Sequence, residues 1–158
     1  MSVATSDYRA LAALRYLLRQ FLREADAAAH RAGLEPQQFQ LLLALRGLPE
    51  SAEPTVQTLA ERLALKHNTT VELIDRMEKH GYVTRTRKED DRRAVLVTFL
   101  PEGERLLEQV ARQRLTEVRA GGAALVNAMN SLLGRNHIRR QATRSSKRHL
   151  PRLKQGRP

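Results

Sequence analysis

Short hydrogen-bonding side chains and cations are concentrated at one predicted helix start. Amide and hydroxyl groups there can exchange hydrogen bonds with base edges in a DNA major groove, and adjacent cations can contact phosphates. Asn68 is equally suited to cap the helix, whereas Thr69 and Thr70 are favoured as DNA contacts. Lys66 and His67 suit either phosphate contact or a solvated loop. The candidate residues are Lys66, His67, Asn68, Thr69 and Thr70.

A second group of charged residues follows the same helix, where two short strands are expected to form a hairpin. Arg93 is the favoured contact, because Asp91 lies on the same side of an extended strand and can orient it. A narrow A·T-rich minor groove has an enhanced negative potential that attracts arginine. The other cations are expected at the phosphate backbone. The set comprises Arg85, Arg87, Lys88, Asp91, Arg92 and Arg93.

Arg76 stands within the predicted helix and has two interpretations. It can contact a phosphate, or it can pair with Glu72 four residues earlier on the same helical face. The two roles are compatible, so both stay open. Glu72 itself faces outward in this pattern and would repel phosphate unless it accepts from a cytosine amino group.

The composition argues against catalysis and against a metal site. The chain contains no cysteine, which excludes disulfides and thiol redox chemistry. Its five histidines lack the close spacing of a structural zinc site. Glu89, Asp90 and Asp91 lie beside arginines, which favours salt bridges. A serine nucleophile elbow, a phosphate-binding glycine loop and paired catalytic carboxylates are all absent. We therefore expect neither an enzyme nor a cofactor.

The net charge of +11 is unevenly distributed along the chain. Residues 135–158 hold nine Lys and Arg and no acid, whereas residues 1–134 carry a net charge of only +2. This basic tail is either a cationic extension that strengthens non-specific DNA binding or a partly helical segment that docks through apolar residues. No apolar run is long enough to span a membrane, and the N-terminus lacks a signal-peptide layout. A cytoplasmic protein is expected.

The elements that must position these side chains follow from apolar periodicity. Residues 8–32 predict a long helix, and Pro36 begins a second. Thr55 caps a third helix, 56–63, which a short turn separates from the helix that begins near 67. Strands are expected at 82–87 and 94–99. A helix follows Pro101, and Gly121-Gly122 is expected to separate it from a last helix that ends near Gly134.

This order predicts a mainly α fold with a small β-hairpin wing (α+β), that is, a winged helix-turn-helix with N- and C-terminal dimerisation helices. The first and last helices are too apolar on one face to remain solvated alone. A homodimer would bury them and present two recognition helices to a pseudo-palindromic site on double-stranded DNA. The expected division is 1–35 and 101–134 for dimerisation, 36–100 for DNA binding and 135–158 for the basic tail, all in one structural unit.

Four stretches in this order resemble the MarR family of winged helix-turn-helix transcriptional regulators. They are Thr55–Leu63, Val71–Val83, Asp91–Arg93 and Pro101–Gly103, and the likeness covers roughly residues 8–134. The resemblance implies a homodimer whose helix matching Asn68–His80 enters the major groove. It also implies that Arg93 reaches the minor groove at the wing tip, held by Asp91. Many members are repressors that small aromatic or anionic ligands release from DNA.

The chain departs from the family pattern at three places. Leu100 and Glu35 each stand where the family usually has a threonine at a helix start, so one capping hydrogen bond is expected to be missing after the wing. The apolar pattern of the last helix gives way to basic residues from Arg135 onward. This third departure bears on the C-terminal half of the implied dimer interface.

An effector pocket is proposed from an arginine with aromatic neighbours, which suits an anionic aromatic molecule. Ordinary core packing beside a solvated arginine explains the same residues more simply. The candidates are Tyr8, Arg15, Tyr16, Phe39 and Leu43.

The function expected from the sequence is that of a dimeric, sequence-specific transcriptional regulator, a repressor released by a small aromatic or anionic ligand. Two alternatives stay open. A winged-helix protein-interaction module would use the same surface without DNA, although an apolar recognition surface would suit it better. A non-specific basic nucleic-acid-binding protein would depend mainly on the tail.

Overall fold

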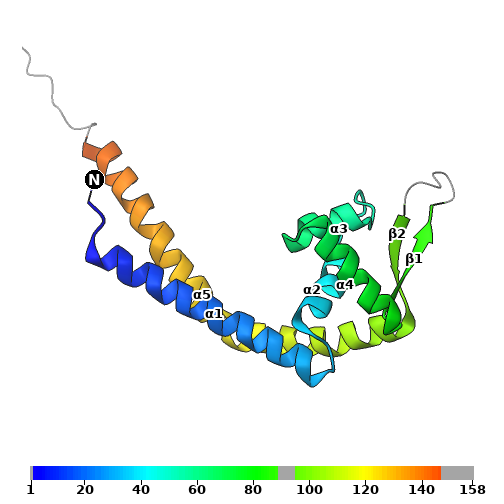
Figure 1. The fold of residues 1–158 in the computed structure, drawn as a ribbon. Helices are drawn as coiled ribbons and strands as arrows, with labels where there is room; N and C mark the ends of the chain where they lie inside the picture. The colour runs from blue at the N-terminus through cyan, green and yellow to red at the C-terminus, as the bar shows by residue number, and fades with distance from the viewer. Residues whose placement is uncertain (1, 89–94, 147–158) are drawn as a thin grey trace, which may run out of the picture. The chain divides into compact units, whose positions relative to one another are not determined.

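The structure is a computed structural model that describes residues 2–88 and 95–146 (Figure 1). It confirms the mainly helical fold with one antiparallel β-hairpin. None of the helices in this part of the chain is long and apolar enough to cross a bilayer. The elements in chain order are α1 (Thr5–Arg31), α2 (Pro36–Arg46), α3 (Val56–Leu63), α4 (His67–Lys79), β1 (Val83–Arg87), β2 (Val95–Phe99) and α5 (Pro101–Ser146).

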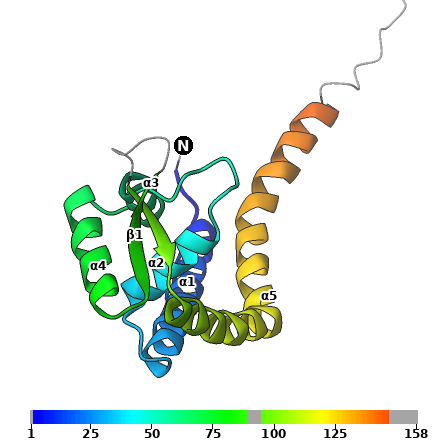
Figure 2. The ribbon, with the colours of Figure 1, turned by 90° about the vertical axis from the view of Figure 1, so that its right-hand side faces the viewer.

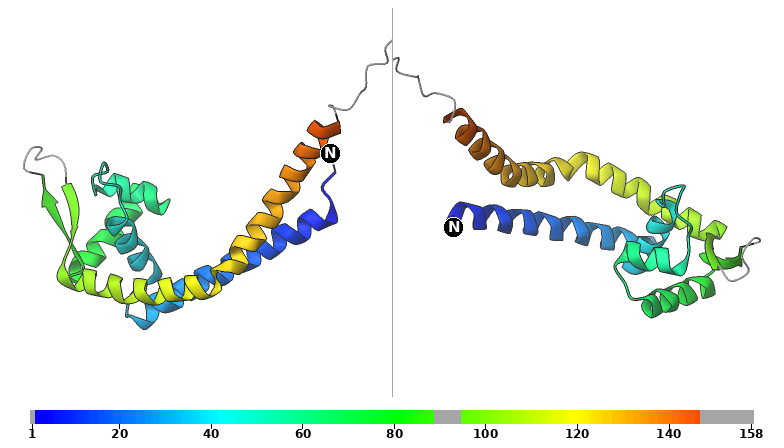
Figure 3. Two further views of the ribbon diagram at one scale, coloured as in Figure 1. Left: turned by 180° about the vertical axis from the view of Figure 1, so that it is seen from behind. Right: turned by 90° about the horizontal axis from the view of Figure 1, so that it is seen from above.

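One predicted boundary is wrong, because α5 is a single helix where two were expected (Figure 3). It continues through Gly121 and Gly122 and past Gly134 into the first half of the basic tail. A glycine costs a helix interior about 1 kcal/mol relative to alanine, which lowers its stability without ending it. Neither predicted stop is followed by a proline or a turn sequence that would force an end.

The chain forms two compact units. Unit 1 is built from Met1–Gln20 and Arg119–Pro158, and unit 2 from Phe21–Val118. In unit 1 the first half of α1 and the second half of α5 flank a groove lined by small and polar residues. These residues are Ser6, Arg9, Ala10, Ala13, Ala128 and Ser131.

Unit 2 contains a continuous apolar core. The ends of α1 and α5 that belong to this unit, together with α2, α3, α4 and the hairpin, all contribute buried side chains. The largest fully buried residues are Leu34, Leu41, Leu42, Leu59, Leu73, Ile74, Met77, Val83, Val97 and Val110. This core holds the helix-turn-helix and the hairpin in one body.

The helix-turn-helix is built by local signals that the sequence carries. The hydroxyl oxygen of Thr55 accepts from the Thr58 backbone N–H at 3.1 Å, which confirms the predicted cap of α3. Ala64 ends α3 with φ 52° and ψ 39°, in the left-handed region. The chain then turns into α4, whose N-cap is Lys66. Residues at i, i+3, i+4 and i+7 of α4 are buried: Thr70, Leu73, Ile74 and Met77.

The left-handed backbone at Ala64 yields a stability prediction. A left-handed L-residue costs about 1–2 kcal/mol, whereas glycine adopts this conformation freely but loses more chain entropy on folding. Ala64→Gly should therefore raise the free energy of unfolding by a net ~0.5–1 kcal/mol, measured by urea denaturation. An equal or lower stability would show that the turn between α3 and α4 is not strained at this residue.

The hairpin is attached to both ends of the helix-turn-helix. Its register pairs Val83 with Phe99, Arg85 with Val97 and Arg87 with Val95. Beside α3, the Val97 backbone N–H donates to the Pro54 carbonyl oxygen at 2.8 Å. At its other end, the Leu100 N–H donates to the Tyr82 carbonyl oxygen at 3.0 Å. Hydrogen bonds thus hold the wing against the segment before α3 on one side and close its base beside the start of α5 on the other.

A buried arginine joins α1 to α5 within unit 2. Arg114 is 7% exposed, and its guanidinium lies 4.6 Å from the Phe21 ring centroid and donates to the Phe21 carbonyl oxygen at 3.2 Å. It also pairs with Glu117, which lies 3.8 Å from Arg31. Burial acts to raise the pKa of Glu117, but hydrogen bonds from Gln113 and Arg114 and the nearby positive charges outweigh it and lower that pKa.

Candidate nucleic-acid interface

The outward face of α4 lies opposite its buried stripe, and α4 itself packs beside the hairpin (Figure 2). Asn68, Glu72, Arg76 and Lys79 are exposed along this face at helical spacing. We call these four residues the recognition face. It offers an amide at the helix start and two cations in its second half. This is the arrangement that suits base edges at one end and phosphates at the other.

The start of α4 shows which of the polar residues are available to a ligand. Lys66, His67 and Asn68 are exposed, and Thr69 is half-buried. Asn68 does not cap the helix, since the N-cap is Lys66 and Asn68 lies inside the first turn. The capping interpretation of Asn68 is therefore wrong, and its side chain is not required to complete the helix.

The expectation that Thr70 faces outward is also wrong. Thr70 is 0% exposed, and its hydroxyl donates to the Lys66 carbonyl oxygen at 3.1 Å. It begins the buried stripe that continues through Leu73, Ile74 and Met77. A direct contact from Thr70 to DNA is excluded in this conformation, because the side chain is covered by the core.

Arg85 differs from its predicted role as a phosphate contact. Its Nη1 lies 2.7 Å from the Asp75 carboxylate and also pairs with Glu78, both on α4. Its Nη2 donates to the Val71 carbonyl oxygen at 3.3 Å. The Arg85 guanidinium is therefore bound by α4. Arg85 makes an internal contact between α4 and the wing, in place of the predicted phosphate contact.

The remaining predicted wing residues are only partly within the described chain. Arg87 is exposed near the far end of β1. Lys88 forms an ion pair with Glu53, in the loop before α3. Asp91, Arg92 and Arg93 lie outside the described residues, so their roles stay predictions.

Arg76 is exposed on the recognition face, and within the described part of the chain it forms no ion pair with Glu72. At the same end of α4, Nδ1 of His80 lies 2.6 Å from the Arg76 carbonyl oxygen. The His80 ring stacks on Tyr82 with centroids 5.4 Å apart. The phosphate-contact interpretation of Arg76 thus stays open, and the end of α4 is anchored by His80.

The five predicted pocket residues do not form one site in either unit. Phe39 is buried in the core of unit 2, which agrees with the core-packing interpretation of this residue. Leu43 is 48% exposed on α2 in the same unit. Tyr8, Arg15 and Tyr16 are exposed on the part of α1 that belongs to unit 1, where Tyr16 accepts a hydrogen bond from Gln20.

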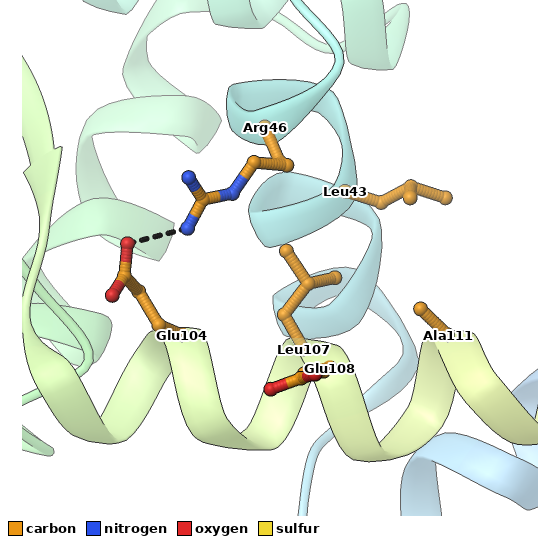
Figure 4. A pocket seen from close by; sticks show the side chains of 6 residues that line it. All are labelled: Leu43, Arg46, Glu104, Leu107, Glu108 and Ala111. Atoms are coloured by element: carbon orange, nitrogen blue, oxygen red, sulfur yellow. Dashed lines mark hydrogen bonds and ion pairs between the residues drawn. The ribbon is translucent and has the colours of Figure 1, made fainter.

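A groove between α2 and α5 in unit 2 is a further candidate ligand site (Figure 4). It encloses ≈ 370 Å³ and is lined by Leu43, Arg46, Glu104, Leu107, Glu108 and Ala111. Arg46 pairs with Glu104 across the groove and lies 4.5 Å from the centroid of the Phe99 ring. Glu108 pairs with Arg112. The lining thus combines an apolar wall with carboxylates that are each neutralised by an arginine.

Sequence reasoning missed two arginines for the same reason. Arg46 lies in the last turn of α2, and Arg114 in the first third of α5, where each resembles an ordinary solvated cation. Arg46 pairs with Glu104, 58 residues away, and Arg114 donates to the Phe21 carbonyl oxygen, 93 residues away, so local spacing does not reveal these two contacts. The available signal for Arg114 was its position four residues after Val110, on the buried side of α5.

Among known proteins, a model of the MarR family matches residues 32–94. The uncharacterized HTH-type transcriptional regulator YsmB of Bacillus subtilis (strain 168) is 33% identical over 101 residues, which are 64% of this chain and 67% of that protein. The organic hydroperoxide resistance transcriptional regulator of the same organism is 38% identical over 74 residues, 47% of this chain and 48% of that protein. The matches span about two thirds and about half of these relatives.

Solved structures share the fold. A MarR family protein from Bacillus stearothermophilus superposes with a TM-score of 0.65 at 25% identity, over 89% of this chain and 99% of that one. A MepR variant of S. aureus, bound to an oligodeoxyribonucleotide, gives 0.58 at 16% identity, over 89% and 99%. CouR from Rhodococcus jostii RHA1, bound to p-coumaroyl-CoA, gives 0.60 at 24% identity, over 76% and 85%.

The helix-turn-helix, the hairpin and the recognition face define a winged helix-turn-helix DNA-binding protein. With these relatives, the assignment can be made more specific: the chain belongs to the MarR family of transcriptional regulators.

Proposed function

We propose that the protein is a homodimeric, sequence-specific repressor of transcription that a small ligand releases from DNA. The observation that carries the proposal is the recognition face of α4, exposed beside a hairpin whose connecting sequence is densely charged and includes Arg92 and Arg93. A module that binds another protein through apolar contacts would need neither a polar helix start nor a charged loop.

The proposed DNA contacts divide between two grooves. Asn68 and Thr69 lie at the N-terminal end of α4, which in helix-turn-helix proteins is the end nearest the bases. Arg76 and Lys79, about two to three turns further along, suit the flanking phosphates. Arg93 would enter the adjacent minor groove, with Asp91 orienting it, as proposed from the sequence. The oligodeoxyribonucleotide bound to the MepR variant supports DNA as the partner of this fold.

The dimer is proposed from apolar surface that unit 1 leaves uncovered. Large hydrophobic side chains between 40% and 65% exposed lie on both helices of this unit, and so much exposed apolar surface is unusual for a monomer. A second copy of the chain is the proposed occupant, since one two-fold axis would then place two recognition helices on one duplex. The residues are Tyr8, Leu11, Tyr16, Leu18, Val126, Met129 and Leu133.

The groove between α2 and α5 is the proposed effector site, for a small aromatic or anionic molecule. An aromatic ring would pack on Leu43 and Leu107, and an anionic group would compete with Glu104 for Arg46. Because Arg46 also lies over Phe99 at the end of β2, this exchange would loosen the base of the wing. CouR with its bound acyl-CoA supports ligand binding by proteins of this fold. The chain has no cysteine, so a thiol cannot be its sensing group.

The wing assignment predicts a large effect at Arg93. Arg93→Ala should weaken binding to a duplex recovered by selection roughly 10- to 100-fold, because it removes the minor-groove contact. Fluorescence anisotropy at fixed salt measures this. Arg112→Ala removes one exposed positive charge on α5, outside the proposed interface, and should change the affinity less than twofold. Equal affinities for Arg93→Ala and wild type would remove Arg93 from the interface.

A further inference from the structure

Arg85, on β1, makes side-chain contacts that all lead back to α4. Its Nη1 lies 2.7 Å from Asp75 and pairs with Glu78, and its Nη2 donates to the Val71 carbonyl oxygen at 3.3 Å. Its backbone N–H also donates to Oε1 of Glu78 at 2.7 Å. Backbone and side chain of one strand residue therefore contact three residues of α4, over two turns.

The strand register explains why Arg85 turns toward α4. Arg85 is two residues after Val83 and opposite Val97, and both valines are fully buried, so the three side chains share the inner face of the hairpin. Arg87 continues the same face but lies further out and is exposed. The Arg85 side chain is 24% exposed and that of Glu78 29%, so the ion pair is shielded from solvent more than a surface pair is.

The planar guanidinium suits this position because it bonds in several directions at once. Two carboxylates and a carbonyl are satisfied by one group, which a lysine ammonium on a flexible chain would hold less rigidly. The contact restrains β1 relative to α4 along the hairpin. Asp75 and Glu78 would otherwise be two uncompensated negative charges on a helix that is proposed to approach phosphates.

We propose that Arg85 is a positioning residue that sets the distance between the recognition helix and the wing. This distance decides whether α4 in a major groove and the wing in the adjacent minor groove can engage the same duplex at once. The inference rests on the proposed DNA-binding function and adds to it a determinant of specificity. Arg85 would act on DNA only through α4 and β1.

The experiment compares Arg85→Met with Arg87→Met on a duplex recovered by selection with the wild-type, full-length chain. Arg87 is the matched control, since it lies on the same strand face and its loss removes the same charge. Dimethyl sulfate protection reports guanine N7 in the major groove, and hydroxyl-radical footprinting reports the minor groove. Arg85→Lys is the conservative variant, and urea denaturation of each protein separates folding from positioning.

Arg85→Met is expected to keep the major-groove protection, to lose the minor-groove footprint and to bind roughly tenfold more weakly. Arg87→Met should keep both footprints and reduce the salt slope by about one ion. Arg85→Lys should recover the minor-groove footprint only in part.

Two results would overturn the inference: a wild-type minor-groove footprint in Arg85→Met, or loss of both footprints in a folded Arg85→Lys protein. If Arg85→Met does not fold, the footprints of Arg85→Lys alone test the inference. A wild-type minor-groove footprint in Arg85→Lys would then contradict the need for the guanidinium. If the wild-type chain itself selects no duplex, the proposed function fails, and that result is distinct from either outcome.

Discussion

Gly103→Ala is expected to destabilise the protein by about 3 kcal/mol or more. A Cβ at this position would lie 2.1 Å from the Tyr82 carbonyl oxygen and 2.9 Å from the Tyr82 carbonyl carbon. Both atoms are backbone, and this oxygen already accepts from the Leu100 N–H at 3.0 Å. The start of α5 must therefore move away from the start of β1, which breaks the attachment of the wing. Urea denaturation followed by circular dichroism measures the loss.

Gly121→Ala is the matched control for this prediction. Gly121 lies in the same helix, and a Cβ added to it meets no atom within 4 Å. Alanine should therefore raise the free energy of unfolding by ~1 kcal/mol through helix propensity alone. The two substitutions are identical in chemistry and opposite in expected sign. If Gly103→Ala were as stable as wild type, the close approach of α5 to Tyr82 would be absent in solution.

Arg114→Met is the second substitution with a large expected effect, a loss of about 3 kcal/mol. Methionine keeps much of the side-chain volume, but it leaves Glu117 without its nearest cation and removes the side-chain donor to the Phe21 carbonyl oxygen. The contact of the guanidinium with the Phe21 ring is lost as well. Thermal and urea denaturation at neutral pH measure the change.

The pH dependence of Arg114→Met provides an independent readout. The pKa of Glu117 is lowered in the folded wild type, so its contribution to stability is present above the unfolded pKa and is lost as the pH falls through the folded value. Without Arg114 this acid-dependent loss should become smaller. Arg112→Met, which removes an exposed arginine that pairs with Glu108, should change stability far less than Arg114→Met. Equal losses for the two variants would contradict a special role for Arg114.

The order of the elements and most of their bounds could be predicted from the sequence, because their signals are local. Thr55 caps α3, Pro36 begins α2 and Gly81 follows α4 with a positive φ of 73°. The predicted break at Gly121-Gly122 was wrong because propensity is a weak force inside a long helix. A glycine pair lowers stability locally, whereas ending a helix also requires a partner for the freed carbonyl groups.

The candidate site was predicted in outline, and its errors have a common physical origin. Thr70 is polar, yet it belongs to the buried 3.6-residue stripe, where its hydroxyl is satisfied by the Lys66 carbonyl oxygen. Arg85 is cationic, yet it shares the inner strand face with Val83. In both cases the periodicity pointed inward and the side-chain chemistry pointed outward. Thr70 is satisfied locally, by the carbonyl four residues earlier, whereas Arg85 is satisfied by tertiary contacts with α4 that no local spacing encodes.

Two recognition helices and two wings of a homodimer are proposed to bind one duplex together. Selection from a pool of random duplexes with the full-length chain, followed by sequencing, tests this arrangement. We expect enrichment of a two-fold-related motif with half-sites about 10 bp apart and A·T-rich sequence where the wings lie. A pool that retains its starting composition after repeated rounds, although the protein is folded and binds duplex, would contradict this arrangement.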